Sequence, residues 1–312
     1  YRIRSMQQGM LFKTVTGNRE YKALISKSGI IQGSASAVLK TFPNNYFQTC
    51  ITSPPYWGLR DYGVSDQIGA ERTVQEYIDS LVHVFHEVKR VLKDDGTFWL
   101  NIGDSYTSGN RTWRDGDRKN PARAMSYRPP TPEGLKPKDL IGIPWRLAFA
   151  LQSDGWYLRS DIIWYKPNCQ PESVKDRPTR SHEYIFLLTK GEKYYYDYEA
   201  IKEDSNNGSK KNKRTVWSIN TEAFNGAHFA TFPESLISPC VLAGSKERDV
   251  VLDPFFGSGT VGSVALKQRR SFVGIEINPE YVEIAKNRIG LSDSLVRNRR
   301  RYHISSILSI MP

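Results

Sequence analysis

The chain has 312 residues, of which 39% are hydrophobic and 25% are charged, and its formal net charge is +11. This composition is ordinary for a globular protein with one large core, with or without a small appended subdomain, and no apolar run approaches the ~18 residues of a membrane span. No charged-then-apolar leader reads as a signal peptide. The three widely spaced cysteines are expected to be reduced thiols in an intracellular protein, because a disulfide scaffold would be denser.

The N-terminal part of the chain predicts the beginning of a sheet. We expect an N-terminal arm at 1–29, a short strand at 30–32, a helical turn at 35–40 and a buried strand at 47–52. Pro54 has no N–H group to donate, so strand pairing cannot continue past it. The segment Ser53-Pro54-Pro55-Tyr56 therefore lies at the C-terminal end of a strand.

The clearest helix is predicted at 74–93. Thr73 and Glu76 form a capping-box pattern before it, and apolar residues recur at helical spacing along it. Asp94-Asp95-Gly96 should end this helix, and a strand is expected at 97–102. Residues 103–138 are rich in Gly, Pro, Arg and Asn and show no periodic face, which predicts a long loop.

Strands and helices continue to alternate in the second half of the chain. Helices are predicted at 140–152, 233–243, 260–267 and 281–289, and strands at 161–165, 183–189, 250–253 and 272–277. The polar, basic residues 204–214 predict a second loop. Such alternation predicts an α/β fold, a doubly wound and mostly parallel sheet that forms one domain at 30–290, followed by a basic tail at 291–312.

The positive charges gather in predicted loops and in the tail. They concentrate at 111–128, 202–214 and 297–301. Lys and Arg displace the counterions condensed on phosphate, so this surplus fits a polyanionic partner, although solubility alone could also explain it. Because loops are the usual sites of DNA contact, the placement favours nucleic acid.

The segment around Gly257 suits a cofactor. The predicted strand at 250–253 runs into Gly257-Ser258-Gly259 and then a helix, whose free N–H groups favour a carboxylate. Glu276 ends the next strand, where a carboxylate can accept both ribose hydroxyls. A different nucleotide or an empty structural turn stays open, although NAD would require Gly-x-Gly-x-x-Gly, which Gly262 fits only in a shifted frame. No histidine pairs with a cysteine at zinc-ligand spacing, so we predict no metal.

The early proline-rich segment suits a flat base that carries an exocyclic amine. The amine's lone pair is delocalised into the ring, and acceptors on its two N–H bonds draw it toward tetrahedral geometry. The Ser53 hydroxyl and the Pro54 carbonyl could serve as these acceptors, and Tyr56 could stack on the base. Trp57 either forms the other wall or simply packs, and the whole segment could instead be an ordinary strand-ending turn.

Together the segments 52–57 and 253–260 resemble motifs of the S-adenosylmethionine-dependent DNA amino-methyltransferases, in the order of the class called beta. The resemblance spans about residues 30–289, and residues 228–233 closely match the segment that wraps the cofactor's methionine. It implies a Rossmann-like methyltransferase fold with long loop insertions for DNA recognition, S-adenosylmethionine as cofactor, and double-stranded DNA with one base flipped out as substrate. Many members carry Gly-Asp where this chain has Gly33-Ser34, so that contact would be supplied elsewhere or the affinity for cofactor reduced.

The resemblance assigns roles to three groups of residues. The catalytic group is Ser53, Pro54, Pro55 and Tyr56. The cofactor-binding group is Phe229, Thr231, Phe232, Asp253, Pro254, Phe255, Gly257, Ser258, Gly259, Thr260, Glu276, Ile277 and Asn278, with Ile277 against the adenine. The candidates for DNA binding are Trp57, Arg60, Lys166, Arg177, Arg180, Lys210, Lys211, Lys213 and Arg214, and the candidate recognition loops are 104–138 and 200–221.

The first residue of the catalytic group bears on the base. In the family, Ser usually accompanies N4-cytosine methylation and Asp or Asn usually accompanies N6-adenine, so we expect N4 of cytosine, with N6 of adenine in DNA or RNA as the alternative. A catalytically inactive nucleic-acid-binding module is a third possibility. Methylation at C5 would require a cysteine nucleophile, and Cys240 lies inside a predicted helix, where we expect it to fill the core.

Other residues have two readings. Three tryptophans are expected more as core anchors than as stacking platforms: Trp145, Trp156 and Trp164. His182 is expected as a scaffold residue more than a base, and Asn101 and Asp104 either border the pocket or cap a helix or loop. We expect a monomer or homodimer of a restriction-modification system in bacterial or phage-infected cytoplasm, or in the nucleus if the source is eukaryotic.

Overall fold

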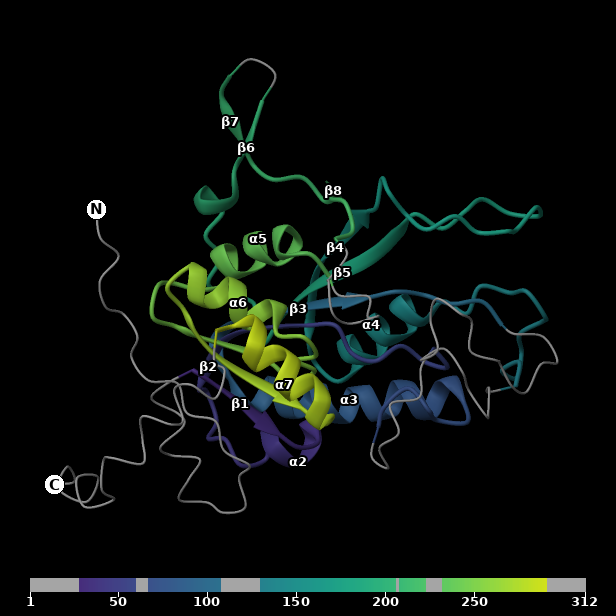
Figure 1. Ribbon diagram of the computed structural model, residues 1–312, viewed down its shortest axis with the longest axis horizontal. Coiled ribbons are helices and arrows are strands. Elements are labelled where there is room, and N and C mark those ends of the chain that lie inside the picture. Colours follow the sequence, from purple (N-terminus) through teal and green to yellow (C-terminus); the bar gives the residue numbers. More distant parts are fainter. Residues whose placement is uncertain (1–27, 60–66, 108–129, 206–207, 223–231, 291–312) are drawn as a thin grey trace, which may run out of the picture.

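The computed structural model describes residues 28–59, 67–107, 130–205, 208–222 and 232–290 (Figure 1). Within them, eight strands form one sheet, and two more form a small hairpin. In spatial order the sheet contains β1 (Gly29–Gln32), β10 (Ser271–Glu276), β9 (Val250–Asp253), β2 (Phe47–Thr52), β3 (Leu92–Ile102), β5 (His182–Thr189), β4 (Tyr157–Tyr165) and β8 (Val216–Ser218).

Only β5 runs against the other strands of this sheet. The pairs from β1 through β10, β9 and β2 to β3 are all parallel. Strand β5 is antiparallel to both β3 and β4, and β8 is parallel to β4. The sheet is therefore mostly parallel, as the alternation of strands and helices predicted.

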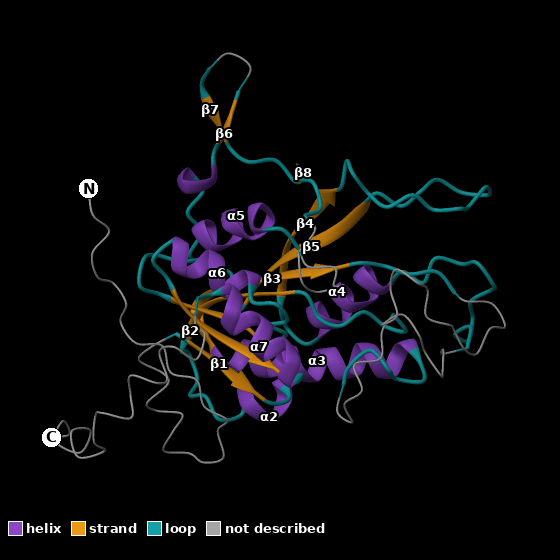
Figure 2. Ribbon diagram, viewed as in Figure 1, coloured by secondary structure: helices purple, strands orange, loops and turns teal. Residues whose placement is uncertain are grey.

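Helices cover both faces of the sheet (Figure 2). One core cluster joins the sheet to α2 (Ala35–Leu39), α3 (Val74–Val91) and α4 (Ile143–Ser153). The other joins it to α5 (Glu234–Gly244), α6 (Thr260–Lys267) and α7 (Pro279–Arg288). The neighbours Ile30 and Ile31 of β1 belong to opposite clusters, because successive side chains of a strand point to opposite faces. The predicted doubly wound fold is confirmed.

The capping box of α3 forms as the sequence predicted, but the helix is shorter at its C-terminus. The Glu76 N–H donates to Thr73 Oγ1 at 3.1 Å, and the Thr73 N–H donates to Glu76 Oε2 at 3.0 Å. The helix ends at Val91 and β3 begins at Leu92, so the predicted turn at 94–96 lies inside a strand. The reason is a register shift: Leu92 pairs with Phe47, whereas Thr97 already pairs with Thr49, so the residues between them form a bulge.

Several other boundaries move by a few residues. Helix α4 begins at Ile143 rather than at 140, because Gly142 has φ of 78° and interrupts the helix. Pro233 is the N-cap of α5 rather than part of its first turn, whereas Pro279 is the first residue of α7. Strand β4 begins at Tyr157, four residues before the predicted strand at 161–165, and pairs with β5 along its length.

The segment predicted as a basic loop at 204–214 includes short strands. It contains the hairpin of β6 (Glu203–Asp204) and β7 (Lys210–Lys211), and β8 follows directly. The short 3-10 helix Glu199–Ile201 precedes the hairpin. Strands of two or three residues carry too little alternation to be recognised from sequence. The hairpin projects at the top of Figure 1, away from the loop that follows β4.

Candidate active site

The two sequence motifs leave the sheet side by side. Strand β2 pairs with β9 in parallel, with Cys50 opposite Leu252, so the segments that follow both strands lie at the same edge. The Thr52 hydroxyl donates a hydrogen bond of 2.5 Å to Asp253 Oδ1, and both side chains are buried. This bond joins the last residue of the strand before Ser53 to the last residue of the strand before the glycine turn.

Asp253 is held in an apolar setting. Burial raises the pKa of Asp253 to about 7, although the hydrogen bonds from Thr52 and from the Phe255 N–H oppose this rise. The N–H of Phe255 donates to Asp253 Oδ1 at 3.1 Å and so shapes the first residues of the turn. Asp253 does not line the cavity described below, so its observed contacts are structural.

A cavity of about 1230 Å³ opens along this edge and takes in both motifs. From the early motif it is lined by Ser53, Pro54, Pro55 and Tyr56. From the predicted cofactor group it is lined by Phe232, Pro254, Phe255, Gly257, Ser258, Thr260, Glu276 and Ile277. The volume exceeds that of a usual small-molecule pocket, and the two motifs share one continuous space.

Backbone donors surround Glu276 at the cofactor end of the cavity. Oε2 of Glu276 accepts a bond of 2.8 Å from the Gly257 N–H, and Oε1 accepts one of 2.8 Å from the Asn278 N–H. Burial raises the pKa of Glu276, and these two N–H groups, together with that of Ile277, oppose the rise. A carboxylate has about four acceptor positions, so capacity for further donors remains on the side that faces the cavity.

Arg288 of α7 holds the hydroxyls of the glycine turn. Its Nη1 donates to Ser258 Oγ at 3.0 Å and to Thr260 Oγ1 at 2.8 Å. The hydroxyl hydrogen of Ser258 is therefore free of this contact and can be offered to an acceptor in the cavity. Sequence reasoning missed Arg288, which lies in a helix with no local sign of its contacts.

The remaining cofactor candidates either have structural contacts away from the cavity or lie outside the described residues. Gly259 and Asn278 do not line the cavity. Gly259 has φ of 82° and a Cβ there would lie 3.1 Å from the Cβ of Ala285, so it permits close packing of α6 and α7. The Asn278 side chain caps α7 by accepting from the Glu280 N–H at 2.8 Å. Phe229 and Thr231 lie outside the described residues.

The base end of the cavity has a fixed loop. Tyr77 of α3 donates its hydroxyl to the Pro55 carbonyl at 2.8 Å, which anchors the proline pair. Trp57 is buried, and its Nε1 donates to the Glu71 carbonyl at 3.0 Å. It lines a neighbouring cavity of about 230 Å³ and not the large one, so of its two readings the structure favours packing.

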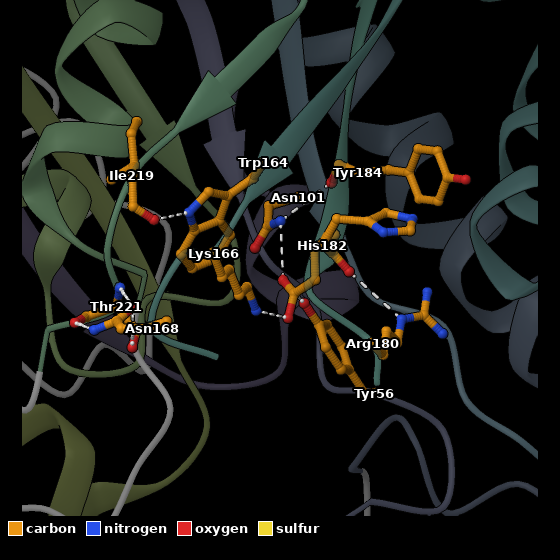
Figure 3. Close-up of polar contacts among 11 residues, drawn as sticks. Tyr56, Asn101, Trp164, Lys166, Asn168, Arg180, His182, Tyr184, Ile219 and Thr221 are labelled. Carbon is orange, nitrogen blue, oxygen red and sulfur yellow. Dashed lines mark hydrogen bonds and ion pairs between the residues drawn. The ribbon is translucent and has the colours of Figure 1, made fainter. Parts of the chain in front are cut away.

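Tyr56 belongs to a polar network that the sequence did not reveal (Figure 3). Its hydroxyl donates to Glu183 Oε2 at 2.8 Å, and Asn101 Nδ2 donates to the same oxygen at 3.2 Å. Lys166 forms an ion pair with Glu183 Oε1. The sequence offered one signal for this network, because the acidic residue Glu183 stands at the start of a predicted strand. Its contact with Tyr56 depends on the position of β5 beside β3.

The other predicted DNA-binding residues have diverse surroundings. Arg177 pairs with Glu172 at 2.6 Å, lies over the ring of Tyr106, and does not line the large cavity. Arg180 does line it, and its Nη1 is buried without a hydrogen-bond partner among the described residues. Arg60 lies outside the described residues.

The basic residues of the hairpin region contact their own neighbourhood. The pairs are Lys210 with Asp204, Lys211 with Glu203, Arg214 with Glu203, and Lys213 over the ring of Trp217. None of the four lines the large cavity. Of the candidate recognition loop at 104–138, residues 108–129 lie outside the described residues.

Most residues with two readings have structural contacts. Trp156 and Trp164 are buried in the core, and Trp145 packs on Phe186, although Trp164 also lines the cavity. Burial and the charge of Arg180 lower the pKa of His182. Cys240 is fully buried in α5, as predicted for a core residue.

Asp104 combines both of its readings, whereas Asn101 borders the cavity and bonds across the sheet rather than capping a helix or loop. Oδ1 of Asp104 accepts from the Gly142 and Ile143 N–H groups at 2.9 and 3.0 Å, so it caps the start of α4. Asn101 ties β3 to β5 through the carbonyl of Tyr184. Both residues also line the large cavity.

Two negative findings concern the described residues alone. No three of their His, Cys, Asp or Glu side chains gather in a way that could hold a metal ion. None of the helices seen there combines the length and the apolar character needed to cross a membrane.

Comparison with solved structures supports the architecture. The PvuII DNA methyltransferase, described as cytosine-N4-specific, superposes with a TM-score of 0.65 at 20% identity and covers 92% of both chains. A DNA modification methylase of Thermus thermophilus, so described with the qualifier "putative" and solved with S-adenosyl-L-methionine, gives 0.59 at 23% identity over 84% of this chain and 92% of its own. At these identities the likeness concerns the fold.

Sequence comparison identifies the family. The Type II methyltransferase M.Cfr9I of Citrobacter freundii is 64% identical over 267 residues, which is 86% of this chain and 89% of the relative. M.SmaI of Serratia marcescens is 66% identical over 262 residues, 83% of this chain and 90% of the relative. A family model described as DNA methylase matches residues 47–287. The chain therefore belongs to the DNA methylase family of N6 and N4 methyltransferases, as the resemblance of its two motifs predicted.

Proposed function

We propose that this DNA methyltransferase transfers a methyl group from S-adenosylmethionine to the exocyclic N4 of a flipped-out cytosine in DNA. The observation that carries the proposal is the single cavity that Ser53–Tyr56 and the glycine turn line from adjacent ends of β2 and β9. The serine that begins the motif supports cytosine, and so does the fold shared with a cytosine-N4-specific enzyme.

The residues at the cofactor end fit S-adenosylmethionine. Glu276 presents a buried carboxylate suited to two ribose hydroxyls, and Ile277 lies beside it on the cavity wall. The Ser258 hydroxyl and the N–H groups at the start of α6 suit the carboxylate of the methionine part. When bound there, S-adenosylmethionine supplies an activated methyl group.

The base end orients the amine that receives the methyl. The Ser53 hydroxyl and the Pro54 carbonyl accept from its two N–H bonds, which turns its lone pair toward the methyl group. The prolines hold this geometry in advance, and the Tyr77 bond to the Pro55 carbonyl supports them. Stacking on Tyr56 contributes ~1–3 kcal/mol, which offsets part of the few kcal/mol needed to extrude the base. No covalent bond to the enzyme is needed: the new N–CH3 bond would form as the S–CH3 bond breaks, S-adenosylhomocysteine would leave as the neutral thioether, and the methylated amine would release its extra proton to solvent.

The partner is double-stranded DNA, for which the net charge of +11 is suited. The relatives named Type II methyltransferases support a role in a restriction-modification system of a bacterial cytoplasm. The chain acts as a monomer or homodimer.

Nucleoside mass spectrometry tests the proposal. The protein is incubated with S-adenosylmethionine and unmethylated genomic DNA, which is then digested to nucleosides. N4-methylcytosine is the expected product. N6-methyladenine would overturn the choice of base, and the absence of any methylated nucleoside, together with DNA binding, would favour a catalytically inactive binding module.

A further inference from the structure

Three donors converge on the carboxylate of Glu183, the second residue of β5, and Figure 3 labels these donors. They are the Tyr56 hydroxyl and Asn101 Nδ2, both on Oε2, and Lys166 Nζ on Oε1. The side chains of Glu183 and Lys166 are only 16% and 17% exposed, so solvent competes little with these bonds. Hydrogen bonds to an ionised group are about twice as strong as neutral ones. This carboxylate therefore holds its three donors strongly at the base end of the cavity.

Lys166 neutralises Glu183 and is itself held in place. Its Nζ lies 4.1 Å from the centre of the Trp164 ring, and both residues line the cavity. A carboxylate this little exposed would be costly without a paired cation. The positive charge of Lys166 is therefore balanced by the carboxylate of Glu183.

Glu183 fixes the orientation of the Asn101 amide. Asn101 Nδ2 also donates to the Tyr184 carbonyl at 3.1 Å, so both of its hydrogens point at acceptors. Exchanging the amide oxygen and nitrogen would set the oxygen against a carboxylate and a carbonyl, so the orientation follows from the partners. Asn101 is 4% exposed and lines the cavity, and its amide oxygen has no hydrogen-bond partner among the described residues. That oxygen is the group that Asn101 can offer to a ligand.

Glu183 also keeps Tyr56 a hydrogen-bond donor with a fixed ring. Burial raises the pKa of Tyr56 well above its usual value, and the charge of Glu183 raises it further. The phenol thus stays protonated, with its hydrogen directed at Oε2. The ring face cannot swing without breaking this bond.

We propose that Glu183 is the positioning residue of the base pocket, which holds the aromatic face of Tyr56 and the amide acceptor of Asn101 in place before the base arrives. The inference rests on the proposed function only in that the base enters the cavity beside Tyr56. It is independent of whether cytosine or adenine is methylated.

The test compares Glu183→Gln with Glu87→Gln. An amide at 183 offers one oxygen to three donors, so the single-turnover rate of methyl transfer should fall about 10- to 100-fold, the effect of a small misplacement. Calorimetric affinity for S-adenosylmethionine should stay within about twofold. Glu87 is matched in chemistry and in its 16% exposure, pairs with Arg90 on α3, and does not line the cavity, so its variant should act as wild type.

A double-mutant cycle with Tyr56→Phe separates positioning from a general structural role. Tyr56→Phe removes only the hydroxyl, which donates to Glu183 and is also hydrogen-bonded to Ser53, so the cycle measures its coupling to Glu183 rather than the loss in the single variant. If Glu183 acts through this hydroxyl, Glu183→Gln should reduce the rate several-fold less in the Tyr56→Phe background than in wild type. Fold-losses that simply multiply would overturn the proposal, as would a wild-type rate in Glu183→Gln or a parallel loss of cofactor affinity.

This outcome is distinguishable from failure of the proposed function. The nucleoside made by the wild-type protein decides between N4-methylcytosine and N6-methyladenine. The rate ratios between variants judge Glu183 with either product. Should Glu183→Gln unfold, Tyr56→Phe alone must still lower the rate at unchanged cofactor affinity, and an unchanged rate there would overturn the inference.

Discussion

Gly103 leaves the space that the ring of Tyr56 occupies. A Cβ at Gly103 would stand 2.8 Å from Cε2 of Tyr56 and 3.3 Å from Cγ of Glu183. The ring cannot retreat freely, because its hydroxyl is bonded to Glu183. The residue after β3 is thus small for a reason that concerns the base pocket.

Gly103→Ala should displace the ring of Tyr56 and lower the rate of methyl transfer about tenfold or more, while cofactor affinity is kept. Gly191→Ala is the control, because a Cβ there meets its nearest neighbour at 3.6 Å, an ordinary contact. Single-turnover rates and calorimetry measure the two effects. An unchanged rate in Gly103→Ala would show that the ring position does not matter.

Ser53→Ala should remove one of the two proposed acceptors of the amine. We expect turnover to fall about 100- to 1000-fold, as when one preorganised hydrogen-bonding group is lost from an active site. Affinity for S-adenosylmethionine should survive, because the cofactor residues lie after β9 and β10. Ser160→Ala is the control, since Ser160 is likewise partly buried but lies outside the cavity. Equal activity of the two variants would contradict the role given to Ser53.

Thr52→Val should destabilise the protein by about 1–3 kcal/mol, because buried Asp253 loses a hydrogen-bond donor. Thr41→Val is the control, since the Thr41 hydroxyl only donates to the Val38 carbonyl within its own turn. Urea unfolding followed by circular dichroism measures both. A similar loss of stability in the two variants would mean that the hydrogen bond between Thr52 and Asp253 contributes no more than a hydroxyl contact within one turn.

The stability of the protein should depend on the titration of Asp253. Burial raises its folded-state pKa from 3.8 to about 7, so the folded protein retains a proton that the unfolded chain releases above about pH 4. The contribution to stability is therefore present below pH 4 and is lost as the pH rises to about 7. Relative to Asp253→Asn, the wild-type free energy of unfolding should fall from pH 5 to pH 7 and level off above it. A pH-independent difference would refute the assignment.

Arg180 and Lys210 should differ in their contribution to DNA binding. Arg180 lines the cavity with a buried nitrogen that lacks a described partner, whereas Lys210 pairs with Asp204 on the hairpin. Arg180→Ala should reduce the slope of log affinity against log salt by about 0.9, the effect of one lost phosphate contact, and Lys210→Ala should leave it unchanged. Fluorescence anisotropy over a salt series measures the slopes. A reduced slope in Lys210→Ala but not in Arg180→Ala would indicate that DNA binds at the hairpin instead.

Local patterns in the sequence predicted the architecture and both motifs. Pro54 at a strand end, the glycines before α6 and each single strand or helix of the alternation can be recognised from short stretches of consecutive residues. Parallel strands share the direction of their ends, so the sequence could also predict that Ser53 and Gly257 meet at one edge. The bulge in β3 and the short strand β8 were not predicted from the sequence, because their formation depends on the partner strand rather than on their own periodicity.

The tertiary structure alone decided which distant side chains meet in the site. Tyr56 and Glu183 are 127 positions apart, and Thr52 and Asp253 are 201 positions apart. Their contacts require the strand order in which β9 lies beside β2 and the reversed β5 lies beside β3, so that β5 begins where β3 ends. Hydrophobic periodicity records which face of an element is buried but not which element lies next to it, and so the chain's own pattern could name Tyr56 but not the carboxylate that holds it.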